Sequence, residues 1–279
     1  FGEHKTEIIS CLNSFHGRTL FTVSVGGQPK YSKDYAPLPQ GITHVPFNDV
    51  AALEATISEN TCAVIIEPIQ GESGILPATQ EYLQAARRLC DEHGALLILD
   101  EVQTGMGHTG KLFAYEHYGI TPDILSSAKA LGGGFPVGAI LTTDKIAPTF
   151  GPGTHGSTFG GNPMACAVGS RAFDIINAPE TLAHVEKQGQ KFQTTLRELG
   201  EKTGVFQEVR GMGLLIGCVL ADKYKGRASE ITAAALKHGL MVLVAGADVV
   251  RFAPSLLLND EDMAEGLKRL EAGLTEWIV

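Results

Sequence analysis

Hydrophobic positions in the first half of the chain fall in short runs between polar turns, as expected for strands buried on both faces of a sheet. Between two of these runs, residues 80–93 repeat apolar positions with helical spacing, and Gly94 ends the helix. The predicted buried strands cover residues 61–66, 95–99, 124–126 and 138–141. This strand–helix–strand order predicts an α/β domain with a mostly parallel sheet.

The pattern changes towards longer helices in the second half of the chain. Asn259 is a suitable N-cap for the last of them. The other predicted helices cover residues 162–177, 179–202 and 229–238, and the predicted strands cover residues 213–220, 241–244 and 249–252. We therefore expect a larger domain over residues 1–176 and a smaller α+β domain over residues 177–279.

Composition excludes several classes of protein. Hydrophobic residues make up 44% of the chain and charged residues 19%, which indicates a folded globular protein. The formal net charge of -9 argues against a nucleic-acid partner, because a polyanion requires a basic surface. No apolar run approaches the ~20 residues of a membrane helix, so no membrane association is expected.

The cysteines indicate a reducing compartment. There are 5 of them, widely spaced and without a CxxC pair, so we expect free buried thiols, no metal site and a cytoplasmic location. The first residues lack both the charged start and the apolar core of a signal peptide. The chain begins at Phe1, close to an apolar run, and we expect it to be a fragment of a longer protein.

Two ionisable residues follow neighbouring predicted strands. Asp100 ends the run Ala-Leu-Leu-Ile-Leu, and Lys129 follows the next strand before three glycines. Ligands bind at the carboxyl ends of such strands. A lysine there is suited to form an imine with an aldehyde cofactor, while an aspartate keeps a pyridine nitrogen protonated. A structural Asp–Lys ion pair explains the same spacing and, on spacing alone, is favoured.

Two further segments support a ligand site. Residues 15–19 combine Phe15, which can stack on a flat ring, with Arg18, whose fork suits a carboxylate. Residues 154–163 combine hydroxyls and glycines with a helix start, a common phosphate site. The alternatives are ordinary packing for the first segment and an ordinary glycine-rich loop for the second.

A third segment imitates a nucleotide-binding loop. Residues 105–111 have the glycines and the lysine of a phosphate loop, but Leu112 replaces the hydroxyl residue that binds magnesium. The acidic Asp100 and Glu101 would also face the phosphates. We therefore reject nucleotide hydrolysis.

Several blocks in one order carry a resemblance to a known family. They are FHGRTLFTVSVGGQPKYS, CAVIIEPIQGESG, LLILDEVQTGMGHTG, TPDILSSAKALGGGFPVGA, GTHGSTFGGNP, VRGMGLLIGCVL and VVRFAPSL. Together they resemble the class III, or ornithine-type, aminotransferases over essentially the whole chain, and most closely the acetylornithine and succinylornithine branch. The resemblance implies the type I fold of transferases that use pyridoxal 5'-phosphate, with a seven-stranded type of sheet in the large domain.

The resemblance also implies roles for cofactor-binding residues. Lys129 is then the lysine that binds the cofactor covalently and carries the proton of the reaction. Asp100 meets the ring nitrogen, Gln103 reaches the phenolic oxygen, and Phe15 stacks on the ring. Thr158 belongs to a loop that a neighbouring subunit lends to the cofactor phosphate, so the enzyme is expected to be at least a dimer.

Substrate contacts are implied in the same way. Arg18 clamps the α-carboxylate of an acylated ornithine, and Ser157 is lent to the substrate by the neighbouring subunit. Glu72 pairs with Arg251 until a dicarboxylate such as glutamate displaces it. The expected reaction is transamination of N-acetylornithine or N-succinylornithine with 2-oxoglutarate in arginine metabolism.

Some features depart from the family pattern. The family usually has glycine at the position of Ser73 and arginine at that of His108, and its members carry an N-terminal stretch, with a phosphate-binding loop, before the segment matching Phe1. Two alternatives therefore stay open. One is an ornithine or 4-aminobutyrate aminotransferase, and the other is an incomplete, non-catalytic fragment that keeps the fold as a scaffold.

Overall fold

The structure is a computed structural model that describes residues 2–278. The chain forms two compact units. The first comprises the chain up to Pro68, Ala78–Met106 and Phe113–Ile176, and the second comprises Ile69–Pro77, Gly107–Leu112 and the chain from Asn177 onwards. Two short segments of the N-terminal half thus belong to the same unit as the C-terminal residues. The predicted division into residues 1–176 and 177–279 does not include this exchange.

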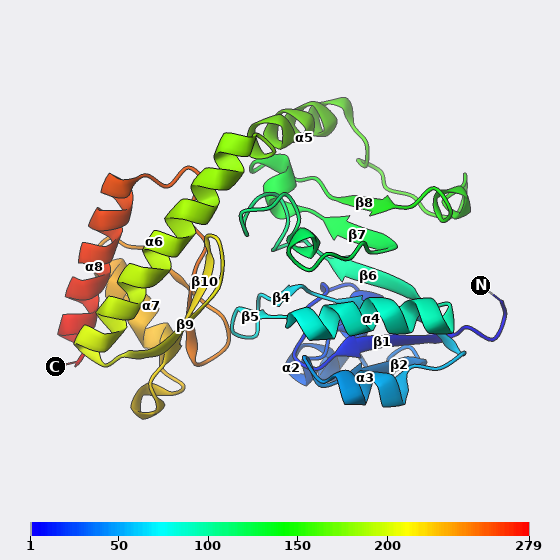
Figure 1. Cartoon of the computed structure of the whole chain (residues 1–279), viewed down its shortest axis with the longest axis horizontal. Coiled ribbons are helices and arrows are strands. Elements are labelled where there is room, and N and C mark those ends of the chain that lie inside the picture. The colour runs from blue at the N-terminus through cyan, green and yellow to red at the C-terminus, as the bar shows by residue number, and fades with distance from the viewer. Residues whose placement is uncertain (1, 279) are drawn as a thin grey trace. The chain divides into compact units, whose positions relative to one another are not determined.

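The first unit is built on a six-stranded sheet with the order β2-β1-β3-β6-β7-β8 (Figure 1). Neighbouring strands pair in parallel except β7 and β8, which are antiparallel. The strands are β1 (Glu7–Cys11), β2 (Ile42–Val45), β3 (Thr61–Ile66), β6 (Leu96–Asp100), β7 (Ile124–Ser127) and β8 (Ala139–Thr142). The predicted α/β class with a mostly parallel sheet is confirmed, although the described residues supply six strands where the resemblance implied seven.

Helix α4 (Gln80–His93) packs against β3 and β6 along one side of this sheet (Figure 1). The Thr79 side chain accepts a hydrogen bond from the Tyr82 amide at its start, and Gly94 ends it in the left-handed conformation. The predicted helix is therefore confirmed at both ends. The other helices of this unit are α1 (Leu20–Val25), α2 (Pro29–Ser32), α3 (Val50–Thr56) and α5 (Pro163–Ile176), with 3-10 turns η1 (Lys33–Tyr35), η2 (Ala114–His117), η3 (Lys129–Gly132) and η4 (Ala147–Thr149).

Strand β8 corrects one prediction. The apolar run at 138–141 was expected to be a buried strand, but Ile140 is 62% exposed and Leu141 45% exposed. β8 is the last strand of the sheet and pairs only with β7 among the described strands. An edge strand lacks a neighbour on one side, so apolarity alone does not bury it.

The second unit contains a four-stranded antiparallel sheet with the order β11-β12-β10-β9. Its strands are β9 (Phe206–Met212), β10 (Leu215–Leu220), β11 (Leu243–Val244) and β12 (Val249–Phe252), and β4 (Ile69–Gln70) and β5 (Leu76–Pro77) form a separate hairpin. The helices are α6 (Pro179–Thr203), α7 (Ala228–Lys237) and α8 (Asp260–Ile278), with the 3-10 turn η5 (Asp222–Tyr224). Apolar side chains of α6, such as Leu196, pack with Ile216 and Val250 of the sheet in one core.

The start of α8 confirms the predicted cap. The side-chain Oδ1 of Asn259 accepts a hydrogen bond of 2.8 Å from the Asp262 amide, which satisfies one of the unpaired N–H groups at a helix start.

The cysteines are all free, but the expectation that all are buried is wrong. Cys11, Cys90 and Cys218 are buried, whereas Cys62 is half-buried and Cys166, on α5, is exposed. Within residues 2–278, no helix is long and apolar enough to cross a membrane.

Candidate active site

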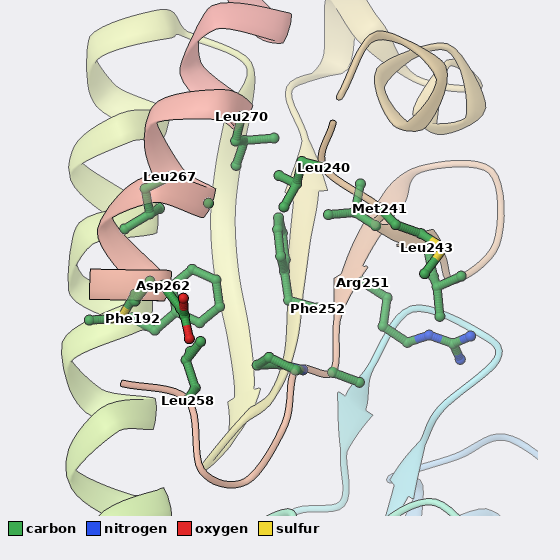
Figure 2. Close-up of a pocket in the computed structure, with 15 residues that line it drawn as sticks. Phe192, Leu240, Met241, Leu243, Arg251, Phe252, Leu258, Asp262, Leu267 and Leu270 are labelled. Atoms are coloured by element: carbon green, nitrogen blue, oxygen red, sulfur yellow. The ribbon is translucent and has the colours of Figure 1, made fainter. Parts of the chain in front are cut away.

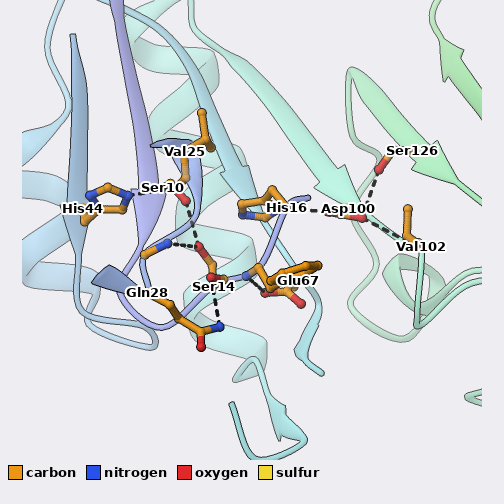
Figure 3. A network of polar contacts seen from close by, with 12 residues as sticks. Ser10, Ser14, His16, Val25, Gln28, His44, Glu67, Asp100, Val102 and Ser126 are labelled. Atoms are coloured by element: carbon orange, nitrogen blue, oxygen red, sulfur yellow. Dashed lines mark hydrogen bonds and ion pairs between the residues drawn. The ribbon is translucent and has the colours of Figure 1, made fainter. Parts of the chain in front are cut away.

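The centre of the candidate site is the carboxylate of Asp100, at the carboxyl end of β6. His16 Nδ1 lies 2.8 Å from its Oδ2, and the side chains of His16 and Asp100 are only 2% and 11% exposed. Its Oδ1 accepts hydrogen bonds from the Val102 amide (3.2 Å) and the Ser126 hydroxyl (3.1 Å) (Figure 3). Ser126 is also the register partner of Asp100 on β7, so the sheet itself brings the two together.

These contacts keep Asp100 ionised. Burial alone raises the pKa of a carboxyl group, but the hydrogen bond and charge of His16, followed by the bonds from Val102 and Ser126, lower the pKa of Asp100 below its ordinary value. The other ring nitrogen of His16, Nε2, is buried and has no hydrogen-bond partner among the described residues. An ionised carboxylate in a largely dry position suits a cationic N–H group of a ligand.

A second buried carboxylate holds the backbone beside His16. Glu67 follows β3 directly, is 5% exposed, and its Oε2 accepts a hydrogen bond of 2.9 Å from the Phe15 amide (Figure 3). Because β3 and β6 are neighbours, the ends of two adjacent strands fix two consecutive residues of one loop. Neither Glu67 nor His16 was predicted as a site residue. Glu67 was detectable, because it follows a predicted strand just as Asp100 does.

Arg18 lies in the same loop and is exposed. Its guanidinium carbon is 5.6 Å from the centre of the Phe15 ring and 4.3 Å from that of Tyr31. The structure thus places Phe15, Arg18 and Asp100 around one loop at the carboxyl end of the sheet.

Lys129 begins η3, three residues after Ser126, and so starts from the same sheet edge as Asp100. Its backbone is left-handed, with φ of 49°, which is uncommon for a residue with a side chain and often occurs at functional sites. The residue is exposed.

Gln103 lies in the turn that follows β6, and Glu101 fixes this turn. The carboxylate of Glu101 accepts hydrogen bonds from the Thr104 hydroxyl and from the amides of Ala114 (2.9 Å) and Tyr115 (2.8 Å). Burial raises the pKa of Glu101 to about 7, although these three bonds act in the opposite direction. Glu101 therefore holds the start and end of the turn together, a role that the sequence analysis did not assign.

The segment that imitates a phosphate loop has no helix at its end. Turns extend from Val102 to Thr109 and bends from Gly110 to Phe113, and the next regular element is the short η2, which begins at Ala114. A phosphate loop requires a helix N-terminus after its glycines, so the structure agrees with the rejection of nucleotide hydrolysis.

Ser157 and Thr158 lie in an exposed loop before α5. Ser157 Oγ accepts a hydrogen bond of 3.0 Å from the Gly160 amide, and Asn162 caps α5 by accepting one of 2.9 Å from the Ala165 amide. Ser157 lines a cavity of about 840 Å³ together with Ser127, at the end of β7. Within the described part of the chain, no hydrogen bond joins Ser157 or Thr158 to Asp100 or Phe15.

Glu72 and Arg251 belong to the second unit, where they form an ion pair. Arg251 Nη1 lies 2.8 Å from Glu72 Oε1 and donates a hydrogen bond of 3.2 Å to the Gly71 carbonyl. Their side chains are 13% (Arg251) and 28% (Glu72) exposed, so the pair is shielded but reachable.

An apolar cavity of about 230 Å³ lies in the same unit, between α6, α8 and β12. Leu240, Phe252 and Leu267 are among its lining residues, and the Arg251 guanidinium points away from it (Figure 2). Its lining is mostly apolar and includes neither Asp100 nor Lys129, so we do not assign the chemistry to it.

Comparison with known proteins identifies the family. The family model described as Aminotransferase class-III matches residues 2–274. The chain belongs to the class III aminotransferases.

Relatives within this family are very similar. The chain is 82% identical to an acetylornithine aminotransferase of Neisseria meningitidis serogroup B over 277 residues, which cover 99% of this chain and 70% of that protein. It is 58% identical to a succinylornithine transaminase/acetylornithine aminotransferase of Pseudomonas aeruginosa, covering 100% of this chain and 68% of that protein.

Solved aminotransferases have the same fold. The N-acetylornithine aminotransferase from Stenotrophomonas maltophilia superposes with a TM-score of 0.85 at 41% identity, covering 99% of this chain and 68% of that one. The ornithine aminotransferase from Toxoplasma gondii superposes with a TM-score of 0.93 at 31% identity, covering 100% of this chain and 66% of that one. The predictions of a class III aminotransferase and of its fold are therefore confirmed.

Class III aminotransferases depend on pyridoxal phosphate, so the cofactor prediction is confirmed at the level of the family. The residues present fit this cofactor. Asp100 offers an ionised, shielded carboxylate to a protonated ring nitrogen, and Phe15 offers an aromatic ring on a backbone whose amide donates to Glu67. Lys129 offers a primary amine on an exposed residue at the same sheet edge.

Proposed function

We propose that this aminotransferase transfers the δ-amino group of N-acetylornithine or N-succinylornithine to 2-oxoglutarate, giving the acylated glutamate semialdehyde and glutamate in arginine metabolism. The observation that carries the substrate is the 82% identity to an acetylornithine aminotransferase across 99% of this chain. The hydrogen-bonded Asp100 beside Phe15 and Arg18 supports the chemistry.

The first unit is proposed as the cofactor-binding domain. Asp100 would hold the ring nitrogen, Phe15 the ring face, Gln103 the phenolic oxygen and Lys129 the aldehyde carbon, while Thr158 would contact the phosphate. When bound, pyridoxal phosphate supplies a ring that withdraws electrons and stabilises negative charge at the substrate carbon.

The chain's own residues then perform three tasks. Asp100 stays ionised and so favours the protonated ring nitrogen, because His16 and Ser126 stabilise its negative charge. Lys129, an exposed residue at this sheet edge, is proposed to take up the proton that leaves the δ-carbon of the substrate and to hold it at Nζ for return. Arg18 is proposed to bind the α-carboxylate through a bidentate pair.

Glu72 and Arg251 are proposed to accommodate the second substrate. While Glu72 neutralises Arg251, a substrate with a neutral end is accepted. A dicarboxylate such as 2-oxoglutarate or glutamate would displace Glu72 and pair with the arginine, whose planar fork suits a carboxylate.

We further propose a homodimer in which Ser157 and Thr158 of one subunit complete the substrate and phosphate sites of the other. The exposed position of both residues leaves them available for this role. The free cysteines agree with a cytoplasmic location.

Ornithine is the second candidate substrate, because the Toxoplasma gondii ornithine aminotransferase gives a TM-score of 0.93. Steady-state rates of the holoenzyme with N-acetylornithine, N-succinylornithine, ornithine and 4-aminobutyrate discriminate the candidates. We expect the highest kcat/KM with an acylated ornithine. Equal or better turnover of ornithine or 4-aminobutyrate would reject the substrate proposal, and no turnover of any amine would favour a non-catalytic scaffold.

The dicarboxylate role has its own test. We expect Arg251→Lys to raise KM for 2-oxoglutarate by about 10-fold or more, because the fork is lost, while KM for N-acetylornithine, whose acyl end is neutral, changes little. Equal increases for both substrates would remove Arg251 from this role.

A further inference from the structure

Tyr31 contacts both an aromatic and a cationic residue of the candidate site. Its ring meets the Phe15 ring edge to face, with centres 5.6 Å apart and an angle of 78° between the planes. The Arg18 guanidinium carbon lies 4.3 Å from the centre of the Tyr31 ring, closer than to that of Phe15. Tyr31 thus contacts both Phe15, the residue proposed to stack on the cofactor ring, and Arg18.

The position of Tyr31 is itself fixed. It belongs to α2, which starts with Pro29 directly after Gln28. The buried Gln28 amide donates hydrogen bonds to the carbonyls of Asn13 (3.0 Å) and Ser14 (3.3 Å), just before Phe15 (Figure 3). The half-buried Tyr31 ring is therefore tied to the loop that it contacts.

Stacking on an aromatic face leaves an arginine ready for a carboxylate. A guanidinium that lies over an aromatic ring uses its flat face for that contact. Its N–H donors lie in its own plane and point outward, away from the contact. Within residues 2–278, no carboxylate lies within 4.0 Å of the Arg18 guanidinium. The fork of Arg18 is thus oriented by rings and open to an external carboxylate.

We propose that Tyr31 is a specificity-determining positioning residue, which orients Arg18 for the α-carboxylate of the amino donor. The proposal rests on the proposed role of Arg18 in acylornithine transamination. Lys30 Nζ also lies 4.7 Å from the Tyr31 ring, but a lysine ammonium offers no planar fork. Replacing Lys30 therefore serves as the control, because it removes a nearby positive charge and leaves the contact between Tyr31 and Arg18 in place.

The test compares N-acetylornithine with N-acetylputrescine, the same amine without the carboxylate, on the holoenzyme. Tyr31→Leu removes the aromatic face, and we expect kcat/KM for N-acetylornithine to fall about 3- to 30-fold, mainly through KM. The value for N-acetylputrescine should change less than about 2-fold, because no carboxylate has to be bound. Tyr31→Phe keeps the face and should behave as the wild type with both amines, as should Lys30→Met.

A double variant tests whether Tyr31 acts through Arg18. Adding Tyr31→Leu to Arg18→Ala should cause no further loss with N-acetylornithine, since the residue to be positioned is gone. Calorimetric titration measures the binding of N-acetylnorvaline, which keeps the carboxylate and lacks the reactive amine. Its binding should be weaker in Tyr31→Leu than in the wild type, and unchanged in Tyr31→Phe.

The outcomes separate the two proposals. Equal losses with both amines in Tyr31→Leu, or a further loss in the double variant, would overturn the role of Tyr31. A wild-type enzyme that does not transaminate N-acetylornithine would overturn the proposed function instead.

Discussion

His16 Nδ1 lies 2.8 Å from Asp100 Oδ2, and both side chains are almost fully shielded from solvent. Burial would raise the pKa of this aspartate, yet the contact with His16 reverses the effect. The folded-state pKa of Asp100 lies below its unfolded value, so the aspartate stabilises the fold above the unfolded pKa. This contribution is lost as the pH falls through the folded pKa.

Replacing His16 is therefore expected to weaken the ionised state of Asp100. In His16→Leu the hydrogen bond and the charge are lost, and we expect the acid limb of kcat/KM to move to higher pH. The free energy of unfolding near neutral pH should fall by about 1.5–3 kcal/mol, the usual value of a hydrogen bond to a charged group. His16→Asn, whose side-chain amide can still donate to Asp100, should recover part of both effects. An unchanged pH profile in His16→Leu would show that His16 does not control Asp100.

Glu101 should make the fold less stable as the pH rises. Its folded pKa of about 7 lies above the ordinary 4.5, so its contribution is complete below the unfolded pKa and is lost as the pH rises through the folded value. A difference of this size corresponds to about 3 kcal/mol. Urea denaturation at several pH values between 4.5 and 8 measures it. We expect Glu101→Gln to flatten the decline seen in the wild type, and an equally steep decline in the variant would contradict the assignment.

Gly213 should tolerate no side chain. Its φ is +54°, and a Cβ atom there would lie 2.4 Å from the His108 carbonyl oxygen and 2.7 Å from the Thr109 carbonyl carbon. Gly226→Ala is the matched control, because Gly226 also has a positive φ of +80° but no atom within 4 Å of a built Cβ. We expect thermal unfolding to show a loss of about 1 kcal/mol in Gly226→Ala and clearly more in Gly213→Ala. Equal losses of stability in Gly213→Ala and Gly226→Ala would contradict this prediction, because they would mean that the backbone at His108 moves to make room for the added Cβ atom.

Sequence patterns predicted the elements whose signals are local. Helix α4 has a cap at Thr79, a regular apolar face and a terminal glycine, and the structure reproduces its limits. Strand β9 was missed because its residues do not alternate regularly between buried and exposed positions, and β1 and β2 are short and mixed in character. The pairing of these strands depends on distant neighbours, which a local pattern does not contain.

The same distinction applies to the site. Asp100 and Lys129 were visible because each follows an apolar run at the end of a strand. His16 and Tyr31 were not, because their importance comes from contacts with Asp100 and Arg18 that exist only after folding. The exposure of Lys129 was also not predictable from its neighbours in the sequence.

The central claim is that Lys129 holds pyridoxal phosphate in this aminotransferase. Reduction of the holoenzyme with sodium borohydride fixes the bond between the cofactor and its lysine, and peptide mass spectrometry then locates it. The prediction is a phosphopyridoxyl group on the peptide that contains Lys129, and its loss in Lys129→Ala together with the visible absorbance of the cofactor. A modified peptide elsewhere in the chain, or unchanged absorbance in the variant, would contradict the account.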